Sequence, residues 1–228
     1  MSTEMPPAGR DPAAAAKLQI LATEHWSLLA TRSLTYTESL GRVNMFLAIL
    51  SGAVIALALV AQADRFGSTF ITVAILMLSV VLFSGIATVA RLMSLNRDDY
   101  RWVVGMNRLR HAYLELHPEL EPNFITSPHD DLAGALQTLG IEPVGGRKLG
   151  SVFHGLQTLP GMLSVIVSVV AGFIAALAAR GFAVPSLGVG ISGAAAFVVA
   201  MVLMGNWGRR SVRKFSPSLE ARFPAPKG

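Results

Sequence analysis

The pattern of apolar and polar positions is clearest between Gly67 and Leu116. Residues 67–90 are 24 consecutive positions without a charge. As a helix they measure about 36 Å, enough to cross a hydrocarbon core about 30 Å thick. No Pro follows before Leu116, and seam positions continue at spacings of three and four: Leu92, Leu95, Asp99, Trp102, Met106, Leu109, Tyr113 and Leu116. We therefore predict one unbroken helix, a transmembrane span over 67–90 with a heptad-patterned extension over 91–116.

A second long helix is predicted over residues 13–63, with its transmembrane span at 43–63. Before the span, seven larger apolar residues fall within an arc of about 160° at 100° per residue. A seam with the same spacing of three and four runs along this helix: Ala22, Trp26, Leu29, Ser33, Tyr36, Leu40, Val43, Leu47 and Leu50. The alternative is that residues 13–41 lie flat on the membrane surface, but such helices usually carry a polar face rich in Lys and Arg, and this one is mainly Ser and Thr.

The rest of the chain divides at Pro and Gly clusters. Residues 1–12 read as a disordered lead, and residues 117–157 as a connector containing a short helix over 128–139. Ser127 as N-cap, Pro128 and a terminating Gly140 predict that helix. Two further uncharged runs predict spans at 160–179 and 187–207, within a hairpin over 158–207, and residues 208–228 form a basic tail. The fold class is all-α: a four-helix transmembrane protein with long cytosolic extensions of its first two transmembrane helices.

Stripes of small residues predict how the third and fourth spans pack. Both spans carry a small residue every four positions, and in antiparallel helices the two stripes face each other, which allows close backbone approach in lipid. We expect Gly172 near Ser192 and Ser168 near Ala196. A third stripe lies on the first span at Ala48, Gly52 and Ala56.

The extensions of the first two helices are expected to stay paired below the membrane. Ser33 lies ten residues before Val43 and Asp99 nine after Ala90, so both are about 14 Å from the membrane edge. The count predicts that the Ser33 hydroxyl donates to Asp99, with Trp102 in the same seam. It also sets three further pairs: Trp26 with Met106, Glu24 with Arg108, and Glu38 with Arg97. The alternative is that Asp99 faces solvent and Ser33 bonds its own backbone.

Composition places the chain among integral membrane proteins, since mean hydropathy is +0.52 and only 14% of the 228 residues are charged. Net charge is +5, and all 19 Lys and Arg except Arg65 and Arg180 lie on one side of the predicted spans. This predicts a multi-pass protein of the cell membrane with both termini cytoplasmic. No motif accompanies the charge, so we expect no nucleic-acid partner. Arg209, Arg210, Arg213 and Lys214 either bind anionic lipid or only set topology.

Candidate chemistry is sparse. The chain has no Cys, which excludes disulfides and thiol nucleophiles. No ionisable residue lies within a span, which counts against pumps and proton-coupled transporters. One segment and its flank gather groups of catalytic or metal-binding type: His111, Glu115, His117, Glu119, Glu121, His129, Asp130, Asp131 and His154. Their spacing matches no metal or catalytic motif, so we expect no enzyme activity and no cofactor.

Two functions stay open at this stage. The first is an oligomeric membrane scaffold or interaction module whose cytosolic helices bind a further copy or a cytosolic protein. The second is a small oligomeric ion channel lined by span hydroxyls. A membrane enzyme ranks below both. The run from Arg108 to Asp131 resembles a segment of small multi-pass bacterial membrane proteins of unknown function; the resemblance covers about residues 17–207 and implies no ligand, substrate or catalytic residue.

Overall fold

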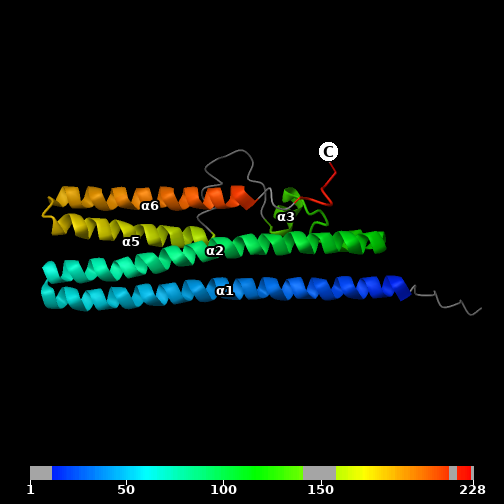
Figure 1. Cartoon of the computed structure of the whole chain (residues 1–228), viewed down its shortest axis with the longest axis horizontal. Helices are drawn as coiled ribbons and strands as arrows, with labels where there is room; N and C mark the ends of the chain where they lie inside the picture. The colour runs from blue at the N-terminus through cyan, green and yellow to red at the C-terminus, as the bar shows by residue number, and fades with distance from the viewer. Residues whose placement is uncertain (1–11, 141–157, 216–219, 227–228) are drawn as a thin grey trace, which may run out of the picture. The chain divides into compact units, whose positions relative to one another are not determined.

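A computed structural model of the chain describes residues 12–140, 158–215 and 220–226, with the backbone only for residues 211–215. The predicted disordered lead, apart from Pro12, and residues 141–157 of the predicted connector lie outside these ranges. Within them every regular element is helical (Figure 1), as the all-α prediction requires: α1 (Pro12–Asp64), α2 (Ser68–Leu116), the 3-10 helix η1 (Pro118–Asn123), α3 (Leu132–Thr138), α5 (Leu159–Gly181) and α6 (Ser186–Phe215).

Among the described residues four helices are long and apolar enough to cross a membrane, the number that the sequence predicts. They are α1, α2, α5 and α6. Helices α1 and α2 have 53 and 49 residues, far more than a span needs, so both extensions are continuous with their spans. In α5 the hydroxyl of Thr158 caps the amide of Gly161 at 3.3 Å, beside the Pro of the first turn.

The chain divides into two compact units. The first, which we call the head unit, contains Met1–Thr35, Asp98–Pro143 and Leu219–Gly228. The second, the span unit, contains Tyr36–Arg97 and Val144–Ser218. Helices α1 and α2 contribute residues to both units.

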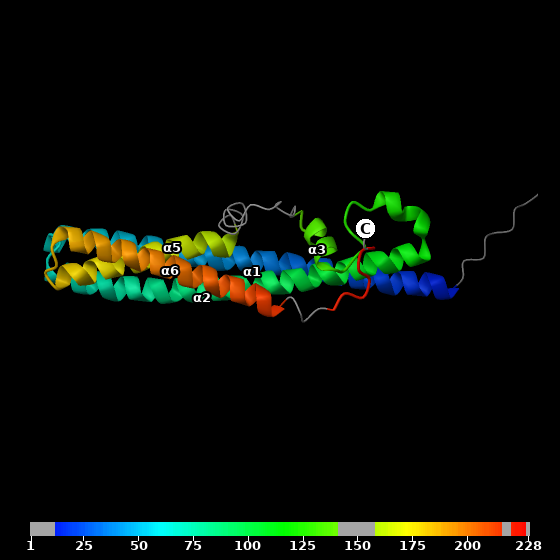
Figure 2. The same ribbon diagram turned by 90° about the horizontal axis from the view of Figure 1, so that it is seen from above.

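The core of the span unit is apolar. Among its most buried side chains are Phe46 of α1, Leu92 of α2 and Leu163 of α5. Gly85 of α2 allows three helices to meet, because a Cβ there would lie 2.6 Å from Val167 Cγ2 and 2.9 Å from Phe46 Cε2. Helices α5 and α6 lie side by side in both views (Figures 1 and 2).

The hairpin of α5 and α6 packs backbone against backbone at Gly172, but α6 presents Gly193 and Phe197 there, each one residue beyond the predicted Ser192 and Ala196. A Cβ at Gly172 would lie 2.9 Å from the carbonyl oxygen of Gly193, so the closest partner is one residue beyond the expected Ser192. Ser168 is fully buried, and its hydroxyl donates to the carbonyl of Ser164 at 2.7 Å. Ser192 donates to the carbonyl of Val189 at 2.9 Å, and Ala196 is half-buried.

The short helix of the connector begins later than predicted. Helix α3 starts at Leu132, and its N-cap is Asp131, whose Oδ1 accepts from the Gly134 amide at 2.8 Å. Ser127 instead accepts from the His129 amide at 3.1 Å, in a turn that precedes the helix. The prediction failed because Ser127 and Asp131 are both good N-cap residues. The end was predicted well, since Gly140 has a φ of +67° after the last turn.

Candidate interaction site

A network of polar side chains in the head unit is built on residues 98–116 of α2. Asn107 is fully buried there and connects three segments. Its Nδ2 donates to the carbonyl of His129 at 2.7 Å, and its Oδ1 accepts from Arg110 at 2.7 Å and from the Thr138 hydroxyl at 2.9 Å. The side-chain amide of Asn107 thus makes hydrogen bonds to three different groups. These bonds hold the connector and α3 in one position against α2.

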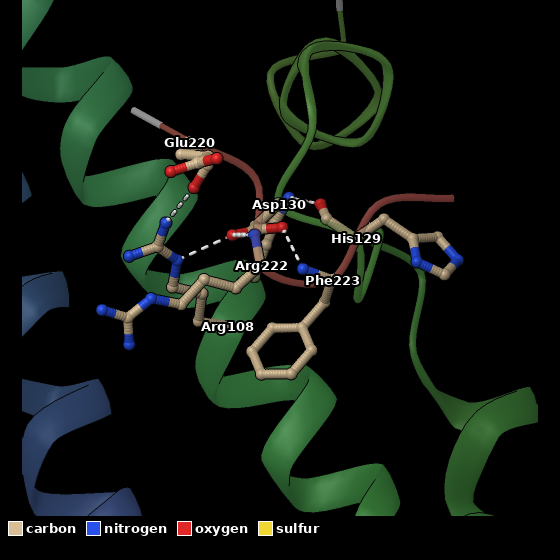
Figure 3. A network of polar contacts seen from close by, with 7 residues as sticks. Arg108, His129, Asp130, Glu220, Arg222 and Phe223 are labelled. Carbon is tan, nitrogen blue, oxygen red and sulfur yellow. Dashed lines mark hydrogen bonds and ion pairs between the residues drawn. The ribbon is translucent and has the colours of Figure 1, made fainter. Parts of the chain in front are cut away.

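That position brings Asp130 beside Arg108 of α2 and the C-terminal segment, as Figure 3 shows. The Asp130 side chain is fully buried. Its Oδ2 accepts from Arg108 Nε at 2.7 Å and from the Arg222 amide at 2.9 Å, while Oδ1 accepts from the Phe223 amide at 2.7 Å. A second guanidinium nitrogen of Arg108 donates to the Glu220 carbonyl at 3.0 Å. One carboxylate thus joins residues separated by more than 90 positions in the sequence.

The neighbouring Asp131 extends the contact. Its Oδ2 accepts from the Ala225 amide at 3.1 Å, while its other oxygen caps α3. The Asp130 amide donates in return to the carbonyl of Phe223 at 3.3 Å. We call Asp130, Asp131, Arg108 and His111 the acidic clamp, and residues 220–226 the C-terminal segment.

An aromatic contact completes the acidic clamp. The ring of Phe223 stacks on that of His111, with centroids 4.0 Å apart and planes 21° from parallel. His111 also lies 3.7 Å from Glu115, one turn further along α2. The C-terminal segment is therefore held at its backbone by two carboxylates and at one side chain by an imidazole ring.

The electrostatics of Asp130 favour its ionised form. Burial alone would raise the pKa of Asp130, but hydrogen bonds from the Arg222 amide, the Arg108 guanidinium and the Phe223 amide outweigh burial and lower the pKa below its ordinary value. These are charge-assisted bonds to a buried carboxylate, the stronger kind of hydrogen bond.

The pairing of α1 with α2 in the head unit differs from the prediction by one residue on α1. Asp99 accepts from Arg32 Nε at 2.7 Å, whereas Ser33 was the predicted donor. Leu28 packs against Gly105, and His25 stacks on Tyr113 with centroids 5.9 Å apart. The side of α1 that meets α2 is therefore rotated from the predicted seam.

The other expected pairs also changed. Trp26 is 71% exposed, so it does not pack on Met106, which is buried. The carboxylate on Arg108 is Asp130 rather than Glu24. Glu38, in the span unit, pairs with Arg91 and Arg42, each at 2.8 Å, rather than with Arg97. Trp102 is half-buried, and its buried indole N–H has no hydrogen-bond acceptor among the described residues.

The remaining sequence candidates fall into two sets. Arg209 and Arg210 are exposed at the end of α6, and Arg213 and Lys214 follow on its helical backbone, with side chains outside the described part. Of the His and acidic residues of the connector, His154 lies outside the described ranges. In those ranges no three His, Asp or Glu are grouped so that they hold a metal ion. Asp130 and Asp131 instead hold the C-terminal segment.

Sequence reasoning did not find the acidic clamp. The bonds run mainly to backbone amides of the C-terminal segment, and backbone groups leave no side-chain pattern to read. The one available signal was the run Arg-Phe-Pro-Ala-Pro at 222–226, whose two Pro favour an extended chain. No protein-family model, curated protein or solved structure matches the chain.

Proposed function

We propose that the protein is a membrane-anchored interaction module that assembles with further copies of itself through residues 12–35 of α1, the part of this helix in the head unit. The exposure of Trp26 carries this proposal. Its side chain is 71% exposed on the apolar side of α1, between Leu18 and Leu29, which are 40% and 41% exposed. The three lie within about 80° of one another on the helix. Large apolar side chains gathered on one exposed face are typical of an interaction site.

Helix α2 leaves this face uncovered because it contacts the other edge of the apolar arc, at Leu28 and His25. Next to Leu18 the surface is hollowed into an open, mainly apolar groove of about 470 Å³, lined also by Tyr113, His117, Glu119, Leu120 and Phe124.

A second copy fits this face because of its spacing. Trp26, Leu29 and Ser33 follow one another at intervals of three and four, the heptad pattern by which a helix packs on a copy of itself. Around a twofold axis each helix supplies both the knobs and the holes of the contact. A cytosolic protein with an apolar helix is the other occupant to consider, and the test below separates the two.

The test is the oligomeric state of the full chain in detergent, measured by light scattering. We expect Trp26→Glu to reduce the mass to that of a monomer while helix content stays unchanged. Leu34→Glu is the matched control, because Leu34 is 70% exposed but lies outside the Trp26 face. If wild-type protein is monomeric, or if both variants dissociate it equally, self-association through this face is wrong.

We infer further that the spans cross the cell membrane with both termini in the cytoplasm, and the distribution of Lys and Arg supports this orientation. Because the chain has no Cys, single cysteines report topology without background. Phe182→Cys lies in the α5–α6 turn, where the side chain is 84% exposed, and Glu121→Cys lies in η1. An impermeant thiol reagent added to intact cells should label the first only. The reverse result would invert the topology.

The channel hypothesis ranks second because span hydroxyls are engaged within their own helices. Thr72, Ser79, Ser164 and Ser168 each donate to a carbonyl four residues back, at 2.7–3.0 Å. Such bonds satisfy the hydroxyl hydrogens within each helix, so these residues need no water-filled pore to be accommodated in a span. Unitary currents from purified protein in planar bilayers would reverse the ranking.

A further inference from the structure

The C-terminal segment packs on the rest of the head unit through one side of its chain. Its exposure alternates along the chain: Ala221, Phe223 and Ala225 are half-buried, while Arg222, Pro224 and Pro226 are exposed. Period-two alternation is typical of an extended chain with one side against a surface. This alternation is therefore a second observation, independent of the hydrogen bonds, that the segment is docked.

The backbone amides of residues 222–225 are all engaged. Pro224 has no amide hydrogen, and the three amides that remain, those of Arg222, Phe223 and Ala225, all donate to the carboxylates of Asp130 and Asp131. The Pro residues restrict the chain before it docks, which lowers the entropy cost of binding. Backbone hydrogen bonds provide affinity in such sites, and side-chain contacts provide specificity.

The specificity contact is the ring of Phe223 on His111. The Arg222 side chain is exposed, whereas Phe223 and Ala225 face the surface. The residues that face the surface are therefore an aromatic one and a small one, and the exposed Pro224 between them restricts the backbone.

We propose that the acidic clamp is a peptide-recognition site for extended segments of the pattern aromatic-Pro-small, and that the C-terminal segment occupies it as a releasable ligand of the same chain. The proposal does not depend on self-association through α1. Arg108 stays beside Asp130 when the segment leaves, so the buried carboxylate keeps one cationic partner in the vacant site.

Release is expected because the contact is small. Five hydrogen bonds and one ring contact give a short free peptide only weak affinity, and tethering compensates by an effective concentration on the order of millimolar. A free peptide should therefore compete at millimolar concentration, and at lower concentration once the tethered segment is weakened. When another peptide occupies the acidic clamp, the C-terminal segment is therefore no longer bound to α2.

Amide hydrogen exchange of the full-length protein in detergent tests this directly. The probe is a synthetic peptide with the sequence of residues 219–228, and the control peptide carries Ala at the Phe position. We expect slow exchange at residues 222–225 of the protein, faster exchange when the probe is added, and no change with the control peptide. Slow exchange that the probe does not alter at several millimolar would overturn release.

Two variants keep the test decisive. Phe223→Ala should free the tethered segment, so that fluorescently labelled probe binds this variant at least about tenfold more tightly than wild type. Added to Phe223→Ala, His111→Ala removes a half-buried ring at the surface of α2 and leaves the buried Asp130 in place, so it should weaken probe binding without unfolding the acidic clamp. Equal binding of probe and control peptide to Phe223→Ala, or no binding of either, would exclude a recognition site.

Discussion

Arg32 of α1 and Asp99 of α2 form the ion pair that joins the two long helices in the head unit. Arg32 Nε donates to Asp99 Oδ1 at 2.7 Å, and a second nitrogen of Arg32 lies 3.4 Å from Oδ2. The side chains are 21% and 16% exposed, so water screens the pair only partly. A charge-assisted pair in such a place provides register and some stability.

We predict that Arg32→Leu costs about 1.5–3 kcal/mol of unfolding free energy, because Asp99 loses its donors in a mostly buried position. Asp99→Leu should cost less, since the long Arg32 side chain reaches water more easily. The double variant should recover much of the loss, because it leaves no charge unpaired. Thermal unfolding in detergent gives all three values, and strictly additive effects would mean that the pair contributes no coupling.

Replacement of Gly172 by Ala should separate α5 from α6. The added Cβ would meet the carbonyl oxygen of Gly193 at 2.9 Å, and backbone cannot move aside as a side chain can. We expect a loss of about 1–3 kcal/mol. Gly190→Ala on α6 is the control, since a Cβ there meets nothing within 4 Å. Both variants gain the same helix propensity, so the difference in melting temperature isolates packing. Equal melting temperatures would contradict the close approach.

Gly85 offers a second packing test, in the core where α1, α2 and α5 meet. A Cβ at this position would overlap Val167 of α5 and Phe46 of α1. Gly85→Ala should therefore destabilise the span unit by about 1–3 kcal/mol. Gly52→Ala on α1 faces open space and should be neutral or stabilising. A neutral Gly85→Ala would show that these three helices do not converge there.

Charge and proline patterns predicted the helices well, but not the contacts between them. Uncharged runs and the absence of Pro determine where α1 and α2 are continuous, because length and hydropathy are local properties. The apolar arc of α1, by contrast, is wide enough that either Trp26 or Leu28 could have faced α2. The rotation of α1 about its own axis determines whether Arg32 or Ser33 reaches Asp99. That rotation is set by the packing of α1 on α2, so the pattern of α1 alone does not predict it.

The acidic clamp was harder still to predict. Asp130 and Phe223 are far apart in the sequence, and their bonds use backbone amides that every residue except Pro possesses. Local rules even misplaced α3, because they favoured Ser127 as N-cap. In the structure the N-cap is Asp131, whose second oxygen binds the Ala225 amide of the C-terminal segment. The N-cap role accounts for an acid at position 131, but only the tertiary structure shows the partner of its second oxygen.

The pH dependence of the span unit should show one acidic component from Glu38. Hydrogen bonds from Arg91 and then Arg42 lower the pKa of Glu38 to about 2. A lowered pKa means that the ionised form stabilises the folded state above the ordinary pKa of 4.5, and that this contribution is lost as the pH falls from 4.5 toward 2. Glu38→Gln should flatten the melting temperature across that interval. An unchanged slope would show that other carboxylates dominate.

The turn between α5 and α6 holds Ala183 in a left-handed conformation. Ala183 adopts a φ of +55°, the left-handed region that costs a residue with a Cβ about 1–2 kcal/mol and costs Gly almost nothing. The turn needs this conformation, because it lets the Ala183 and Val184 amides bond the carbonyls of Arg180 and Ala179 at 3.0 and 3.1 Å. Ala183→Gly should therefore stabilise the hairpin by about 0.5–1 kcal/mol, net of the entropy that Gly adds to the unfolded chain. Ala179→Gly, the same substitution inside α5, should instead destabilise it by about 0.5–1 kcal/mol. Thermal unfolding of both variants measures the two signs, and a loss of stability in Ala183→Gly would mean that residue 183 does not adopt a left-handed conformation in the folded hairpin.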